Sequence, residues 1–178
     1  LGILSNQTQV LGNFIGVNAD GSQALANVGR GVVIRDGLDH LIGGPIAGQG
    51  NVISGNTSDG VLIEGVDSTG NLIEGNVIGL DSQGMTDVGN GGAGVVLLNT
   101  SGNVVGGPSP ESGNVISGNT AEGVRIATDG GAPADGNEVL SNLIGVDGDG
   151  GAAVPNGSDV VLLLGATNSQ IGGPGQGN

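Results

Sequence analysis

The segment Gly50-Asn51-Val52-Ile53-Ser54-Gly55-Asn56 returns unchanged as Gly113-Asn114-Val115-Ile116-Ser117-Gly118-Asn119, 63 residues further along the chain. A second motif keeps the same distance. Ile42-Gly43-Gly44-Pro45 resembles Val105-Gly106-Gly107-Pro108 after 63 residues, and Ile171-Gly172-Gly173-Pro174 after a further 66. Because independent motifs agree on one spacing, the chain is built from an internal repeat of about 63 residues.

Each repeat divides into two coils of about 31 and 32 residues, in which three columns of residues each begin a short apolar strand. The spacing from the first column to the second alternates between 18 and 9 residues, so the two coils differ in which corner holds an inserted loop. The first column consists of Asn13, Asn51, Asn76, Asn114, Asn142 and Asn178. The second consists of Gly31, Gly60, Gly94, Gly123 and Val160. The third consists of Thr8, His40, Asn71, Asn103, Asn137 and Ser169.

Three short strands in every coil, with no helical pattern between them, predict an all-β solenoid. Like strands stack on like strands and form three parallel sheets around one core, with a rise of about 4.8 Å per coil. We therefore predict a parallel β-helix of about five to six coils that occupies residues 1–178 as a single domain. The first column becomes an asparagine ladder, in which each buried amide bonds the next coil and the turn backbone.

Composition and charge exclude several classes of function. The chain has 17 acidic residues and 3 arginines, for a net charge of −14, and this argues against nucleic acid as a partner. No apolar run approaches the about 20 residues that a membrane span requires, so membrane insertion is not expected. The 41 glycines follow no three-residue period, which excludes collagen. One Phe, with no Tyr or Trp, means that branched aliphatic residues fill the core.

The quoted motifs resemble the right-handed parallel β-helix repeats of large secreted or surface bacterial proteins, a group that shares its architecture with pectate-lyase-like enzymes. The resemblance covers essentially the whole chain. It implies a right-handed winding and a secreted or cell-surface location. It is specific for the fold and not for the function, because β-helices carry enzymes, adhesins and passive stalks.

An active site is not expected in this segment. Polysaccharide-cleaving β-helices need paired carboxylates or a metal with a basic residue, and aromatic platforms for sugar rings. We interpret Arg125 as an outward side chain, Arg30 and Arg35 as partners of nearby acids, and His40 as a hydrogen-bonding replacement for asparagine in its column. The preferred function is a non-catalytic stalk, spacer or fibre subunit. The alternative is a carbohydrate-active or sugar-binding β-helix whose site lies outside this segment.

Calcium is the one cofactor that the sequence suggests. Asp147 and Asp149, with Asp81 and Asp20 in the equivalent loops, are candidate ligands because Ca²⁺ prefers six to eight oxygen atoms. Aspartate is also an ordinary turn residue that bonds its own backbone, and no glutamate closes a twelve-residue calcium loop. Both interpretations stay open here, so a calcium-stabilised module is a further alternative.

Two outward columns are unexpectedly apolar, since residues two apart in a strand share a face. The first column consists of Val33, Leu62, Val96, Arg125 and Leu162. The second consists of Phe14, Val52, Val77, Val115 and Leu143. Either the inserted loops cover these columns, or another chain packs on them. With strand-like or interrupted motifs at both termini, the pattern predicts a part of a longer repeat array that self-associates end to end or side by side, or that binds other surface proteins or polysaccharide.

Overall fold

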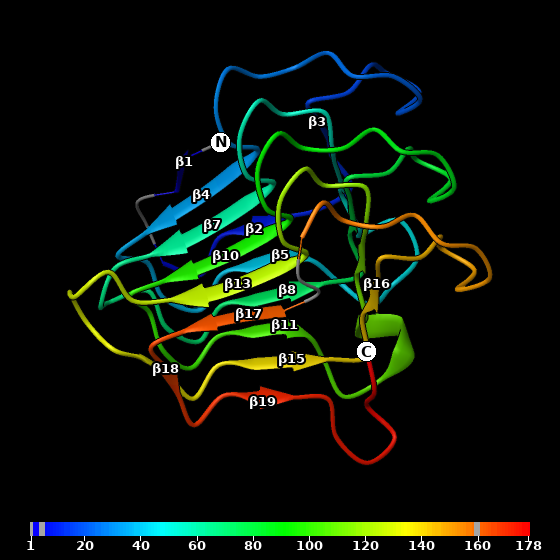
Figure 1. The fold of residues 1–178 in the computed structure, drawn as a ribbon. Coiled ribbons are helices and arrows are strands. Elements are labelled where there is room, and N and C mark those ends of the chain that lie inside the picture. The colour runs from blue at the N-terminus through cyan, green and yellow to red at the C-terminus, as the bar shows by residue number, and fades with distance from the viewer. Residues whose placement is uncertain (1, 4–5, 159–160) are drawn as a thin grey trace.

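The chain forms an all-β parallel solenoid of about five turns (Figure 1). The computed structural model describes residues 2–3, 6–158 and 161–178. Among these residues the single helical element is a short 3-10 turn, η1 (Pro110–Ser112). The predicted fold class is confirmed, and the chain winds repeatedly around one core. Val160, which was assigned to the second column, lies outside the described residues.

Three parallel sheets line the three sides of the solenoid, and each takes one strand from successive coils. The first sheet consists of β1 (Gly2–Ile3), β4 (Val32–Arg35), β7 (Val61–Glu64), β10 (Val95–Leu98), β13 (Val124–Ala127) and β17 (Val161–Leu164). The second consists of β2 (Gln9–Val10), β5 (Leu41–Gly43), β8 (Leu72–Glu74), β11 (Val104–Gly106), β15 (Glu138–Leu140) and β19 (Gln170–Ile171). The third consists of β3 (Phe14–Ile15), β6 (Val52–Ile53), β9 (Val77–Ile78), β12 (Val115–Ile116) and β16 (Leu143–Ile144). A small pair joins β14 (Ala134–Asp135) and β18 (Ala166–Thr167).

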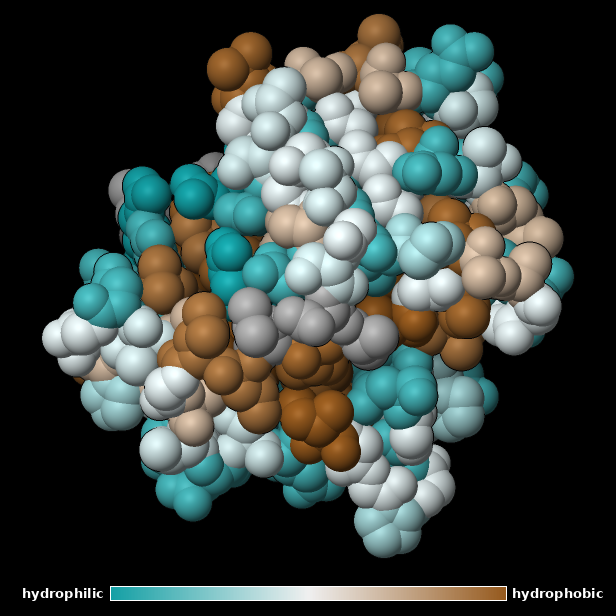
Figure 2. Space-filling view, viewed as in Figure 1, coloured by the Kyte–Doolittle hydropathy of each residue, from teal (hydrophilic) through white to brown (hydrophobic). Residues whose placement is uncertain are grey.

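The core is built from the branched aliphatic residues that alternate inward along these strands. Val32 and Ile34 of β4 are fully buried, and their partners in register, Val61 and Ile63 of β7, are buried equally. Leu163 of β17 pairs with the buried Ile126 but is 45% exposed, because β17 lies at the edge of its sheet. Figure 2 shows apolar residues gathered over this edge strand.

The outward apolar column of the first sheet is covered by the chain itself. Leu62 and Val96 are each 1% exposed and form a second apolar cluster with Ala93, which lies just before β10. Of the two interpretations of this column, cover by the chain itself is therefore correct for Leu62 and Val96, and packing of another chain on them is wrong, because the segment leading into each strand folds over them. Val33 is half-buried against the same cluster. The side chain of Leu162 lies outside the described residues.

The predicted asparagine ladder is present along the whole third sheet. The backbone N–H and side-chain amide of Asn51 both donate to Oδ1 of Asn76, at 3.0 and 2.9 Å. Asn76 in turn donates from both groups to Oδ1 of Asn114, at 3.0 and 2.9 Å. The same bonds continue in both directions and link all six members of the column. Asn76 and Asn114 are each 1% exposed, as predicted.

A further ladder of the same kind was not recognised from the sequence. Asn56 donates its backbone N–H and side-chain amide to Oδ1 of Asn90, at 3.1 and 2.8 Å, and Asn90 continues to Asn119. The full column consists of Asn27, Asn56, Asn90, Asn119 and Asn156. Each member precedes the second sequence column by four residues. That constant spacing was the signal that could have identified the ladder.

Inserted loops occupy alternate coils and bond to one another across the coil between them. Three loops, residues 17–24, 80–87 and 146–153, follow β3, β9 and β16, and an antiparallel bridge closes each one. Ser82 donates its N–H to the carbonyl of Gly21 at 3.0 Å, and Gly148 donates its N–H to the carbonyl of Gly84 at 2.7 Å. The Gly-Gly-Pro loops lie in the other coils, at the opposite end of the same sheet.

The ladder generates a stability prediction. Asn76→Ala should lower the free energy of unfolding by about 1–3 kcal/mol, because the buried N–H of Asn51 and one of its two amide hydrogens lose their acceptor. Asn13→Ala is the matched control, since Asn13 lies exposed at the end of the ladder and should cost less. Chemical denaturation of both variants measures the difference. Equal effects at the two positions would show that burial of the ladder contributes little.

Candidate functional site

The carboxylates proposed as calcium ligands lie in the three hairpin-like loops, where three of the four accept a loop backbone N–H. Oδ1 of Asp81 accepts the N–H groups of Met85 and Thr86, at 2.9 and 3.2 Å. Oδ1 of Asp147 accepts the N–H of Gly151 at 2.7 Å. Burial alone would raise the pKa of Asp81, but these backbone donors outweigh it and lower the pKa below its usual value. This arrangement agrees with the turn interpretation of both residues.

The remaining two calcium candidates occupy matching loop positions. Asp20 and Asp149 are both exposed. Asp20 accepts hydrogen bonds from the hydroxyl and the N–H of Ser22, and the hydroxyl bond is the larger cause of a lowered pKa at Asp20. Within the described ranges no three or more His, Cys, Asp or Glu side chains come together as metal ligands do. Calcium binding stays a prediction. A calcium ion takes six to eight oxygen ligands, and each loop supplies at most two of the candidate carboxylates.

The loop bonds of Asp81 can be tested directly. Asp81→Ala should lower the free energy of unfolding by about 0.5–1.5 kcal/mol, because two loop N–H groups lose their acceptor. Asp149→Ala is the control, since its exposed side chain should matter little. Thermal unfolding with CaCl₂ and with a chelator separates the two interpretations. A midpoint that rises with calcium in the unaltered chain, and not in Asp81→Ala, would instead assign Asp81 to an ion.

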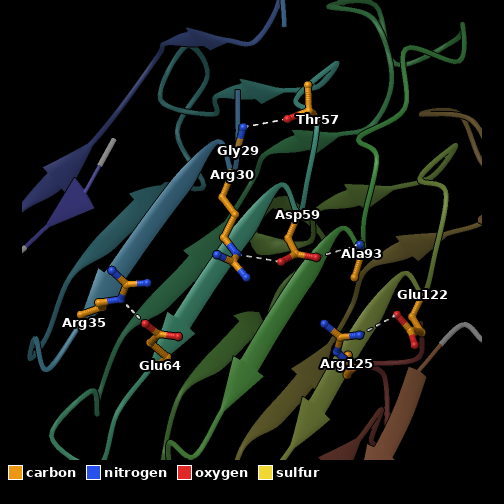
Figure 3. A network of polar contacts seen from close by, with 9 residues as sticks. All are labelled: Gly29, Arg30, Arg35, Thr57, Asp59, Glu64, Ala93, Glu122 and Arg125. Carbon is orange, nitrogen blue, oxygen red and sulfur yellow. Dashed lines mark hydrogen bonds and ion pairs between the residues drawn. The ribbon is translucent and has the colours of Figure 1, made fainter. Parts of the chain in front are cut away.

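All three arginines form ion pairs on or beside the first sheet (Figure 3). Nε of Arg30 lies 2.8 Å from Oδ2 of Asp59, whose Oδ1 accepts the N–H of Ala93 at 3.1 Å. Arg35 pairs with Glu64 in the neighbouring strand. These contacts confirm that Arg30 and Arg35 balance nearby acids. The buried Asp59 thereby joins three successive coils.

Arg125 pairs within its own coil. Its Nη1 lies 3.5 Å from Oε2 of Glu122, and the Arg125 side chain is 33% exposed. The predicted outward orientation is confirmed, although the residue is more buried than a solvated side chain would be. All three arginines are therefore paired to acids, two of them between coils and Arg125 within its own.

His40 takes the place of an asparagine in the third column, as predicted. Its Nδ1 accepts the N–H of Thr8 at 3.0 Å, and its own N–H donates to Oδ1 of Asn71 at 3.0 Å. The ring is 1% exposed. Because Nδ1 is an acceptor, the proton of the neutral ring resides on Nε2, and that buried atom has no hydrogen-bond partner among the described residues.

This unsatisfied donor predicts a stabilising substitution. His40→Asn should raise the free energy of unfolding by about 1 kcal/mol, because an asparagine supplies the acceptor for Thr8 and removes the buried donor without a partner. His40→Ala should lower it, since the N–H of Thr8 then loses its acceptor. Urea denaturation gives both values. A loss of stability in both variants would mean that ring packing outweighs the unsatisfied nitrogen.

A groove runs over the outward face of the third sheet, between the two families of loops. It has a volume of about 680 Å³, within the about 300–1,000 Å³ range of ligand sites. Phe14, Val52 and Val77 form its floor, and they lie in register on adjacent strands. The Gly-Gly-Pro loop of residues 44–50 lines one side, and residues 20 and 82–83 line the other. Sequence analysis identified the floor residues only as an outward apolar column.

The rim of this groove is acidic. Asp20 and Glu111 both line it, and both are exposed. Hydrogen bonds from its own backbone N–H and from the side chain of Ser109 lower the pKa of Glu111, so this carboxyl group, like that of Asp20, stays ionised in mildly acidic solution. No arginine or histidine lines the groove. The rim therefore carries negative charge above an apolar floor.

No family model, curated protein or solved structure matches the chain. Helices are too short, throughout the part of the chain that the structure describes, for any of them to cross a membrane.

Proposed function

We propose that this chain is a rigid, non-catalytic spacer or stalk segment of a secreted or cell-surface protein. The observation that carries the proposal is a set of three side-chain ladders, the two described above and a third in which Asn71 bonds Asn103 and Asn103 bonds Asn137. Such bonds are made to buried groups and are costly to leave unsatisfied. The coils are thereby held in one register and resist bending apart.

Further features support a mechanical role. Arg30 and Arg35 join neighbouring coils through ion pairs, Arg125 pairs within its own coil, and the one histidine is a buried member of a ladder. We also propose a right-handed winding, because crossovers between parallel strands of one sheet are right-handed in about 98% of cases. The location outside the cell follows from the motif resemblance, and the self-association of copies, expected from the sequence pattern, belongs to the same proposal.

Rigidity can be measured with paired spin labels, since the chain contains no Cys. Gln9 and Gln170 are exposed, and they lie at opposite ends of the second sheet, five coil steps apart. The backbones at these two positions should lie about 24 Å apart. Labels on Gln9→Cys and Gln170→Cys should therefore give a narrow distance distribution, centred on this value plus the length of the labels. The same pair in urea is the control. A broad distribution under native conditions would exclude a rigid spacer.

A further inference from the structure

The groove over the third sheet has a preformed shape. The loop of residues 44–50 is fastened to the first coil, because Gly12 donates its N–H to the carbonyl of Gln49 at 2.8 Å. On the opposite side, the hydroxyl of Ser82 donates to the carbonyl of Asp20 at 2.7 Å. Both sides are therefore held by bonds between coils. A preformed groove loses little conformational entropy when it binds a ligand.

The floor is unusually apolar for a surface that faces solvent. Phe14 is the one aromatic residue of the chain and is 48% exposed, and Ile46 beside the floor is 65% exposed. Val52, by contrast, is 6% exposed at the centre of the floor. Three adjacent strands span about 10 Å, which matches the length of three extended residues. The floor thus fits a short extended segment with an apolar side chain.

Charge decides what kind of segment fits. The chain has no Lys, and its three arginines are paired on or beside the first sheet, so no cation of the chain neutralises Asp20 and Glu111 at the rim. An anionic ligand would be repelled. A second copy would bring another net charge of −14. A cationic group, by contrast, can pair with the carboxylates at the rim.

We propose that this groove binds an extended segment of a partner protein in which apolar residues alternate with arginine or lysine. The apolar side chains lie on Phe14, Val52 and Val77, while the cations face Asp20 and Glu111. This site is independent of the spacer function, because a rigid stalk needs no ligand and a flexible one could still bind. It gives the solenoid a specific attachment point on one face.

The test uses six-residue peptides of alternating arginine and valine that end in tryptophan, whose fluorescence is free of background because the chain has no Trp. Matched peptides carry glutamine or glutamate in place of arginine. The arginine peptide should bind, and Asp20→Asn with Glu111→Gln should weaken it about fivefold. Asp67→Asn with Glu138→Gln removes the same charge away from the groove and should change binding less than about twofold.

The floor has its own pair of variants. Phe14→Ala should weaken the arginine peptide, whereas Leu25→Ala should not, because Leu25 is 68% exposed and does not line the groove. Equal losses in the two charge variants would overturn the proposal, since they would indicate nonspecific attraction to an acidic chain. Equal binding of the glutamine peptide, or no binding of any peptide, would overturn it as well.

Amide chemical shifts locate the peptide on the unaltered chain, so the result does not depend on whether a variant folds. Shifts confined to the residues that line the groove, namely 14, 20, 44–52, 75–83 and 111, support the proposal. Shifts spread over the acidic surface contradict it. A neutral oligosaccharide such as maltohexaose that shifts the same amides, while the arginine peptide does not, would replace the peptide site with a sugar site.

Discussion

At each corner of a solenoid, the polar groups of one coil are packed between the coils before and after it and still need hydrogen-bond partners. Here asparagine side chains supply those partners. Its side chain has the same donor and acceptor pair as a peptide group, so one residue per corner accepts from the preceding coil and donates to the following one. Asn51, Asn76 and Asn114 repeat this arrangement with nearly constant distances. Strand stacking, core burial and loop placement all depend on the register that these bonds fix.

Close stacking also explains the glycine content at the corners. A Cβ atom on Gly43 would lie 2.0 Å from the carbonyl oxygen of Glu74, and the backbone there has a φ of +80°. Neither the space nor the conformation accepts a side chain. The Gly-Gly-Pro motif is therefore a requirement of tight turns between coils. Its repetition in the sequence reports a backbone constraint and gives no information about catalysis.

Much of the fold could be predicted because its columns keep fixed spacings. The ladder through Asn56 and Asn90 was missed because loops of unequal length separate its members, and the spacing is constant only when counted back from the following glycine. Burial of Leu62 under Ala93 depends on the path of a segment that no period describes. The groove could not be predicted, since loops from different coils form its two sides. Aspartates such as Asp81 were ambiguous because turns and calcium loops use the same residues.

The inserted loops bond to one another across every second coil, and these bonds limit how many coils such a solenoid can gain or lose at once. Ser82 reaches Gly21, and Gly148 reaches Gly84, across an intervening coil that has a short corner. Loss of a single coil would bring a long loop directly against another, and gain of one would separate the two loops beyond reach. The sheets and ladders inside have a period of one coil, whereas the surface has a period of two. Gene duplications that preserve both periods must add or remove coils in pairs.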